Sequence, residues 1–435
     1  MSLWKLYDEI ERPLVPVLGD MEMAGVKIDT DVLSHLSIKM EAFAEEQRYI
    51  LSDVAGDDFN PRSSMQKAVL LYDTLGAVVK RRTKKAKNPS ADKLALSMMI
   101  PTECKNVALP GKPATCDHLL CTTAQALLNL TETLTALTNF VYKLPLLVLE
   151  DGRVHGSFNQ GGHWEETGDD YHGSPATGRL SSSGPNLQNI STRGRWGKLI
   201  RQAFIPEKGY VFVAGDVGQE ELRIAALLAN ETRLLDNFDD PNYDPHEETA
   251  LMAGLRAGVK EDRDLAKNGN YACIYGVMAK KLLAMFPEFG TLERAEAFRR
   301  AFFENFPHFE QWHKESRRTA VRLGYVETWF DRRRYLPDIY SSIWGKRAEA
   351  ERQAVNTPVQ GTGADVIKIS LRRVWEQNSG YKSRQVLSSH DDQVVETLIS
   401  EVPRVKKMLE QMTDGILPVT LPMDVKEGKN WGDIE

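Results

Sequence analysis

The sequence is poor in cysteine and contains no long hydrophobic run. Only 4 of its 435 residues are Cys, which excludes a scaffold held together by disulfides and suits a reducing compartment. No stretch approaches the roughly 18 uncharged apolar residues that a membrane-spanning helix needs. Residues 1–12 turn acidic before any apolar signal-peptide core forms. We therefore expect a cytoplasmic protein without a secretion or membrane signal.

An excess of positive charge is also missing. The chain has 55 Lys and Arg against 61 Asp and Glu, a net charge of −6. This balance excludes a simple polycationic coat for nucleic acid but is compatible with a local basic groove on an acidic body. The composition, 42% hydrophobic and 27% charged, is that of a soluble globular protein. The length predicts two or three subdomains.

Hydrophobic periodicity predicts many helices and a small sheet. The predicted helices cover residues 31–51, 119–144, 220–229, 246–323 and, with a Pro/Gly interruption, 348–376. Apolar or alternating runs predict strands at 210–215, 385–389 and 393–399. Because the strands come from distant parts of the chain, this pattern is typical of an α+β fold.

Carboxylates stand at the ends of these predicted strands. Asp216 ends the strand at 210–215, and His390-Asp391-Asp392 forms a polar turn between two later strands. Three carboxylates at one edge of a sheet repel each other unless a divalent cation is present. Magnesium prefers such oxygen ligands, and two ions about 3.5–4 Å apart would support phosphoryl or nucleotidyl transfer. The alternative is that Asp216 caps a helix and the Asp pair makes an ordinary turn.

A stripe of cations and tyrosines is predicted on one helix. Arg263, Lys267, Tyr271 and Tyr275 follow each other at steps of four residues, which places them on one slowly rotating face. Two cations followed by two rings match a triphosphate followed by a sugar and a base. The alternative is a solvated face whose tyrosines lie at a subdomain contact.

The segment at 177–189 is polar and rich in turn residues. Its arginine and amide side chains suit contacts to phosphates and to minor-groove acceptors. An ordinary surface loop is the alternative.

Together these motifs resemble the polymerase region of family A DNA polymerases, the bacterial DNA polymerase I type. The segments that carry the resemblance are 177–190 (TGRLSSSGPNLQNI), 216–223 (DVGQEELR, similar to motif A), 263–276 (similar to motif B), 352–365 and 390–392 (similar to motif C). Their order and spacing agree across about residues 150–435, and the first 150 residues fit more loosely. Five motifs in the right order make the resemblance highly specific.

The resemblance implies a right-hand polymerase fold, with an antiparallel palm sheet and helical fingers and thumb. The implied palm segments are 1–29, 149–225 and 346–435, the thumb is 30–148 and the fingers are 226–345. The implied function is template-directed DNA synthesis, a nucleotidyl transfer that serves replication or repair. The implied cofactor is Mg²⁺, as two ions, with Mn²⁺ as a substitute. The implied partners are primer-template DNA and deoxynucleoside triphosphates, and we expect a monomer at the nucleoid of a bacterium or phage-infected cell.

The resemblance also assigns roles to residues. The implied catalytic residues are Asp216, Asp391 and Lys267, and the implied metal ligands are Asp216 and Asp391, with Asp392 in a supporting role. The implied nucleotide-binding residues are Arg263, Lys267, Tyr271, Tyr275, Glu221, Gln219 and His390. The implied DNA-binding residues are Arg179, Asn186, Gln188, Asn189, Arg352, Asn356 and Gln360. Among these, Glu221 is implied to exclude the ribose 2′-hydroxyl, and Tyr275 to guard the templating-base pocket.

The chain departs from the family pattern at a few positions. Asp392 stands where Glu is usual, and Gly218, Ala272 and Gly184 replace the usual Ser, Gly and acidic residue. None of these changes removes a metal ligand. Family members of this type carry a proofreading-type domain before the polymerase region, whereas this chain opens at what resembles the first palm segment. We therefore expect no 3′→5′ exonuclease activity in this chain.

Two alternatives stay open at this stage. The chain could be a retired polymerase that binds primer-template DNA without catalysis, although its retained Asp and Lys residues argue against this. Separately, Cys104, Cys116, His118 and Cys121 could form a Cys₃His zinc site. The lack of a CxxC pair argues against zinc.

Overall fold

The computed structural model describes residues 3–56, 58–83, 87–100, 119–164, 171–173, 175–192, 194–240, 242–389 and 391–434. The chain forms two compact units, one of Met1–Lys27, Arg153–Asn189 and Ile205–Glu435, the other of Ile28–Gly152 and Ile190–Phe204. Helices predominate over small antiparallel sheets, which confirms the predicted α+β class. None of the described helices is both long and apolar enough to cross a membrane.

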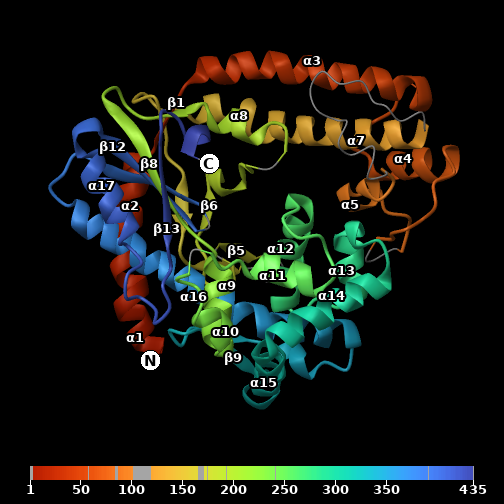
Figure 1. The fold of residues 1–435 in the computed structure, drawn as a ribbon. Coiled ribbons are helices and arrows are strands. Elements are labelled where there is room, and N and C mark those ends of the chain that lie inside the picture. Colours follow the sequence, from red (N-terminus) through yellow and green to blue (C-terminus); the bar gives the residue numbers. More distant parts are fainter. Residues whose placement is uncertain are drawn as a thin grey trace. The chain divides into compact units, whose positions relative to one another are not determined.

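The smaller unit is built on two long helices that lie side by side, α3 (Thr30–Ala55) and α7 (Leu119–Ala136) (Figure 1). The Asp29 carboxylate caps α3 by accepting hydrogen bonds from two backbone N–H groups of its first turn. Apolar residues of both helices, with Leu51 and Leu127 at 2% and 0% exposure, form a buried cluster. Shorter helices complete the unit: α4 (Ser64–Ala68), α5 (Lys93–Ser97) and α8 (Gly197–Arg201).

The larger unit contains a four-stranded antiparallel sheet of order β11-β12-β8-β13. Its strands are β8 (Tyr210–Val217), β11 (Arg384–Ser389), β12 (Asp392–Leu398) and β13 (Met423–Gly428). Val213 and Val395 are paired across β8 and β12 and pack in one cluster with Met408 and Leu409 of α17 (Val402–Glu410). Since side chains alternate along a strand, this packing directs the intervening residues of both strands to the opposite face.

Helices and small sheets make up the rest of the larger unit. The N-terminal helices are α1 (Leu3–Leu6), a π-turn (Tyr7–Glu11) and α2 (Arg12–Ala24). The helices after β8 are α9 (Glu220–Ala229), α10 (Thr232–Leu235), α11 (Pro245–Met252), α12 (Lys260–Ile274), α13 (Ala279–Met285), α14 (Leu292–Asn305) and α15 (Pro307–Leu323). Two-stranded sheets pair β3 (Ser157–Asn159) with β6 (Ser181–Ser183), β4 (Gly162–Trp164) with β5 (Tyr171–Gly173), and β9 (Tyr325–Glu327) with β10 (Arg333–Tyr335). A three-stranded sheet has the order β2 (Arg153–Val154), β1 (Val26–Ile28) and β7 (Phe204–Ile205).

The predicted interruption within 348–376 is wrong. The structure has one continuous helix, α16 (Trp344–Asn378), with Pro358 inside it. The Thr362 hydroxyl donates to the Pro358 carbonyl at 2.6 Å and accepts from the Trp329 N–H at 2.9 Å. Residues 357–368 are nearly all buried, so tertiary packing outweighs the local helix-breaking tendency of proline and glycine.

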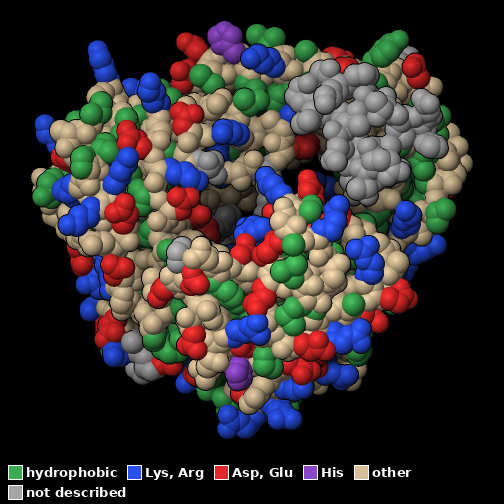
Figure 2. Space-filling model, in the orientation of Figure 1, with side chains coloured by type: hydrophobic (Ala, Val, Ile, Leu, Met, Phe, Trp, Pro, Cys, Tyr) green, Lys and Arg blue, Asp and Glu red, His purple; other side chains and the backbone are tan. Residues whose placement is uncertain are grey.

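Some residues named in the sequence analysis lie outside the described residues: His390, Cys104, Cys116 and His118. The remaining member of the alternative zinc set, Cys121, is 4% exposed and packs in the hydrophobic cluster of the smaller unit. On the face drawn in Figure 2, Lys and Arg side chains are interspersed with Asp and Glu, in line with the nearly balanced composition.

The close contact between α12 and α14 gives a stability prediction. A Cβ placed on Gly269 would lie 2.6 Å from a ring atom of Phe298, which is 1% exposed and packs on Phe289. We expect Gly269→Ala to lower the free energy of unfolding by about 1–3 kcal/mol, measured by denaturant titration, since the ring has little room to move.

The matched control is Gly19→Ala in α2, where a Cβ meets nothing within 4 Å. This change should raise the free energy of unfolding by about 0.5–1 kcal/mol, because alanine favours the helix. Equal effects at the two glycines would contradict the packing argument.

Candidate active site

Carboxylates from three neighbouring strands meet in one rung of the four-stranded sheet. Asp216 on the central strand β8 is paired directly with Asp392 on β12 and with Asp424 on β13. Residues paired across antiparallel strands point to the same face, so these side chains lie on the face opposite α17. Ser389 pairs with Asp392, which places Asp391 in the tight turn beside the rung.

The rung holds more negative than positive charge. Desolvation and then repulsion from Asp391 raise the pKa of Asp216 from its ordinary 3.8 to about 6. Asp424 adds to the repulsion, whereas Lys426 and Lys267 counteract it. The Asp216 residue remains exposed to solvent, so its desolvation comes from a crowded, open edge and not from burial in the interior. Such an edge favours a cation from solution.

The carboxylates are suited to magnesium without enclosing it. In the part of the chain that the structure describes, no three His, Cys, Asp or Glu side chains converge as a ready cage for a metal ion. Mg²⁺ is usually held by one or two carboxylates together with waters and substrate phosphates, and not by an all-protein cage. An open edge with Asp216 and Asp391 side by side therefore fits that ion.

Helix α12 presents the predicted cationic stripe within the same unit. Lys267 is exposed and lies close enough to Asp216 to lower its pKa, so this helix faces the rung. Arg263 donates to Asp244, the residue that caps α11, and holds the pKa of that carboxyl below its usual value in spite of burial. The opposite side of α12, with Ala266 and Cys273, is buried.

The tyrosines of the stripe continue toward the carboxylates. Burial, and then the charges of Glu221 and Asp391, raise the pKa of Tyr271 to about 12. Its ring lies 5.9 Å from that of His246 on α11. The Tyr271 hydroxyl is thus neutral and available as a hydrogen-bond donor between the stripe and the rung.

Arg179, Glu221 and Tyr275 form a second cluster. Arg179 Nη2 donates to Glu221 Oε1 at 2.9 Å, and both side chains are about one-third exposed, at 30% and 27%. Burial and the charge of Glu221 raise the pKa of Tyr275, and Gln360 of α16 lowers it. The buried Tyr275 hydroxyl makes no hydrogen bond to any described residue. The structure therefore brings together residues as far apart in the sequence as Arg179 and Gln360.

The remaining predicted residues occupy mixed positions. Gln188 Nε2 donates to the Ser388 carbonyl at 3.1 Å, next to the carboxylate turn. Asn186 and Asn356 each bury a side-chain oxygen that has no partner among the described residues. Arg352 pairs with Glu349 on its own helix. Gln219 is an exposed residue at the start of α9 with left-handed backbone, and Asn189 is exposed.

Three further residues near the site were not predicted. Asp424 and Lys426 lie two residues apart on β13, and Lys426 Nζ is 3.3 Å from Asp424 Oδ2. The alternation of apolar and charged residues in Met423–Gly428 is the signal that could have predicted this strand. Glu220 is 5% exposed, and burial, then Asp391, raise its pKa to about 8. Nothing in the sequence indicates that Glu220 is buried, since glutamates in the first turn of a helix usually face solvent.

His246 also went unpredicted. Burial lowers its pKa to about 4, an effect that Arg263 and Lys267 reinforce. It is therefore a neutral imidazole at neutral pH, and its Nδ1 lies 3.1 Å from Asn270 Nδ2.

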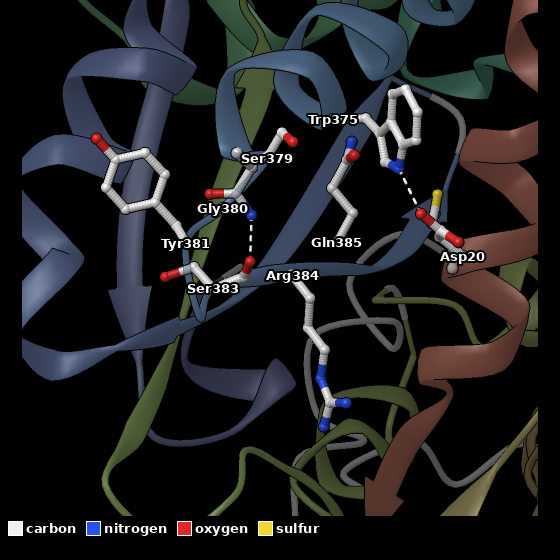
Figure 3. A pocket seen from close by; sticks show the side chains of 10 residues that line it. Asp20, Trp375, Ser379, Gly380, Tyr381, Ser383, Arg384 and Gln385 are labelled. Carbon is white, nitrogen blue, oxygen red and sulfur yellow. Dashed lines mark hydrogen bonds between the residues drawn. The ribbon is translucent and has the colours of Figure 1, made fainter.

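A pocket of about 300 Å³ lies at the C-terminal end of α16, at the opposite end of β11 from the rung (Figure 3). Trp375 Nε1 donates to Asp20 Oδ2 at 2.6 Å in its wall, and Arg384 and Gln385 line it from β11. It contains none of the predicted site residues.

A family model described as DNA polymerase family A matches residues 30–433. Thermostable DNA polymerase I of Thermus aquaticus is 34% identical over 441 residues, which cover 99% of this chain and 48% of that protein. DNA polymerase I of Pseudomonas aeruginosa is 33% identical over 452 residues, which cover 99% of this chain and 45% of that protein. The chain spans about half the length of the curated relatives it matches.

Among solved structures, the chain is similar to the POL domain of Pol1 from M. smegmatis in complex with DNA primer-template and dNTP. The TM-score is 0.85 at 28% sequence identity, and the match covers 99% of this chain and 71% of that chain.

The raised pKa of Asp216 gives a pH prediction. Its pKa of about 6 in the folded protein exceeds the ordinary 3.8, so between these values the folded state holds a proton that the unfolded chain releases. Ionised Asp216 therefore destabilises the fold above about pH 6. We expect Asp216→Asn to raise the melting temperature in metal-free buffer at about pH 8, and this gain to vanish near pH 4.

The matched control is Asp53→Asn, an exposed aspartate on α3, whose effect should not change over this pH range. A melting temperature of Asp216→Asn that tracks wild type at every pH would contradict the repulsion at the rung.

Proposed function

The chain belongs to DNA polymerase family A, and we propose that it extends the 3′ end of a primer on a DNA template with deoxynucleoside triphosphates. The observation that carries the proposal is the rung of carboxylates on the sheet, with a cationic helix facing it in the same unit. The rung can hold cations at the reacting atoms, and the helix can hold the triphosphate.

Asp216 and Asp391 would hold two magnesium ions, and Asp392 would support them. When bound, these ions supply positive charge to the attacking and leaving oxygens of the nucleotidyl transfer. The residues themselves keep both charges at one edge, since their strands are fixed by backbone pairing. Lys267, exposed and near Asp216, is placed to bind the phosphates of the incoming nucleotide and to neutralise charge there.

The other site residues would position the substrates. Arg263 would exchange Asp244 for the triphosphate, and Tyr271 would pack at the sugar. Glu221, held by Arg179, would exclude the ribose 2′-hydroxyl, and Tyr275 would guard the templating base. Gln219 and His390 complete the proposed nucleotide site. The primer terminus and its minor groove would contact Arg179, Asn186, Gln188, Asn189, Arg352, Asn356 and Gln360.

The proposed domains follow the same scheme. Residues 1–29, 149–225 and 346–435 would form the palm, 30–148 the thumb and 226–345 the fingers. We propose that these residues act as a monomer without degrading a primer from its 3′ end, at the nucleoid of a bacterium or phage-infected cell. A 3′-mismatched, end-labelled primer without nucleotides should stay full length.

A primer-extension assay with magnesium tests the proposal against its rival, a primer-template binding protein without catalysis. Both bind the duplex, but only a polymerase lengthens the primer in the order that the template dictates. The retained Asp216, Asp391, Arg263 and Lys267 favour the enzyme.

The metal assignment predicts that Asp391→Asn abolishes extension and leaves duplex binding nearly intact, because backbone phosphate contacts supply most of the affinity. Single-turnover extension and filter binding would be measured on the same preparations. The neighbouring change Asp392→Asn is the matched control and should be milder. Extension by Asp391→Asn within about tenfold of wild type would contradict the assignment.

The position of Tyr271 predicts how the enzyme treats dideoxynucleotides. A deoxynucleotide can bond its own phosphates through its 3′-hydroxyl, a dideoxynucleotide cannot, and a neutral tyrosine hydroxyl could supply the missing bond. A hydrogen bond to a charged group contributes about 1.5–3 kcal/mol, or roughly 10- to 150-fold in selectivity. We expect Tyr271→Phe to discriminate against dideoxynucleotides by this factor, with little loss in normal extension.

The measurement is the ratio of kcat/KM for the deoxy and dideoxy forms of one base. Tyr340→Phe, at an exposed tyrosine bonded to the Val321 carbonyl, is the control and should leave the ratio unchanged. A shift below about threefold in Tyr271→Phe would mean that its hydroxyl does not face the sugar.

A further inference from the structure

A group of four charged side chains is buried beside the Arg179–Glu221 pair. Arg332 donates from Nε to Asp365 Oδ1 at 2.9 Å, and its Nη2 contacts both Asp365 and Glu11. Lys368 Nζ donates to Glu11 Oε1 at 2.8 Å. The Asp365 and Lys368 side chains are 0% and 1% exposed, and the other two are 16% exposed. The group contains two cations and two anions, so it has no net charge.

Arg332 is held in place by more than its ion pairs. Its backbone N–H donates to the Thr328 hydroxyl at 3.2 Å, and that hydroxyl donates to Asp365 Oδ2 at 3.0 Å. The backbone of Arg332 and its guanidinium are thus both held by hydrogen bonds. A side chain fixed in this way can act as a rigid surface against which another segment packs.

The segment that packs against it is the backbone of Gly178. A Cβ on Gly178 would lie 2.6 Å from Arg332 Nε and 2.7 Å from its Cδ, closer than any real side chain allows. Gly178 also has φ of +85°, a conformation that favours glycine. The preceding Thr177 is 8% exposed. Position 178 is therefore fixed by contact with Arg332, and Arg179 is the next residue.

We propose that Arg332 is a positioning residue for Arg179, and through it for the Arg179–Glu221 pair that governs the sugar of the incoming nucleotide. The inference rests on the proposed polymerase function. Arg332 does not bind substrate in this scheme. It fixes the backbone from which Arg179 reaches Glu221, 2.9 Å away.

The decisive variant is Arg332→Lys, because it separates positioning from folding. A lysine keeps the positive charge beside Asp365 and Glu11, whereas removal of all charge would leave buried carboxylates unpaired and endanger the fold. Lysine keeps a stem beside Gly178 but lacks the second nitrogen by which the guanidinium is fixed on Asp365 and Glu11, so its stem is no longer held in one place. We expect a melting temperature close to that of wild type, with deoxynucleotide kcat/KM reduced about 10- to 100-fold and altered selectivity between ribo- and deoxynucleotides.

Two control variants isolate the contact. Arg333→Lys alters the neighbouring arginine, whose pair with Glu327 is exposed at 36% and 35%, and should change neither quantity. Gly178→Ala attacks the contact from the other side, and Gly209→Ala is its match, with φ of +89° but nothing within 4 Å of the new Cβ. Gly178→Ala should reproduce the selectivity change, and Gly209→Ala should cost only stability.

A double-mutant cycle with Arg179→Ala shows whether Arg332 acts through Arg179. On the Arg179→Ala background, Arg332→Lys should change kcat/KM by less than about threefold. Additive losses in the cycle would overturn the inference while leaving the polymerase function intact.

A crystal structure of Arg332→Lys supplies a readout that needs no activity. Loss of the Arg179–Glu221 pair would support the inference, and an unchanged pair would overturn it even in a protein that extends no primer. Failure of wild type to extend a primer, by contrast, would overturn the proposed function itself.

Discussion

The register between β8 and β12 is the constraint on which the site depends. Val213 opposite Val395 must face α17, and the alternation of side chains then requires Asp216 and Asp392 to share the other face. A slip of one residue would bury the carboxylate against α17 and expose the valines. The hydrophobic core on one side of the sheet therefore determines the chemistry on the other side, and the hairpin carrying Asp391 follows from the same register.

That constraint holds like charges together at a cost to the fold. Backbone pairing keeps Asp216 beside Asp424 and the turn with Asp391, so desolvation, then repulsion from Asp391 and Asp424, raises the pKa of Asp216 instead of changing the structure. Lys267 and Lys426 offset part of it. Strain of this kind is common where a protein keeps groups ready for a ligand at the expense of stability.

The sequence predicted what depends on local periodicity and missed what depends on tertiary contact. The strand ending at Asp216 and the turn at Asp391 could be predicted, because apolar runs and polar turns are local signals, and the same holds for the spacing of Arg263, Lys267 and Tyr271 on α12. Asp424 was missed since its strand is short and polar. The continuous α16 was missed because burial overrides Pro358, and the contact of Gly178 with Arg332 joins segments that no local pattern connects.

Two sets of carboxylates in the same unit are neutralised in different ways. Asp365 and Glu11 are neutralised by ion pairs with Arg332 and Lys368, and all four side chains are at most 16% exposed. The rung at Asp216 is open to solvent, and Lys267, whose charge lowers the pKa of Asp216, is itself exposed. A fixed countercharge produces a rigid support, whereas an open, negatively charged edge attracts cations from solution. The support lies beside the Arg179–Glu221 pair, and on the proposed function its rigidity would be a condition for selectivity between nucleotides.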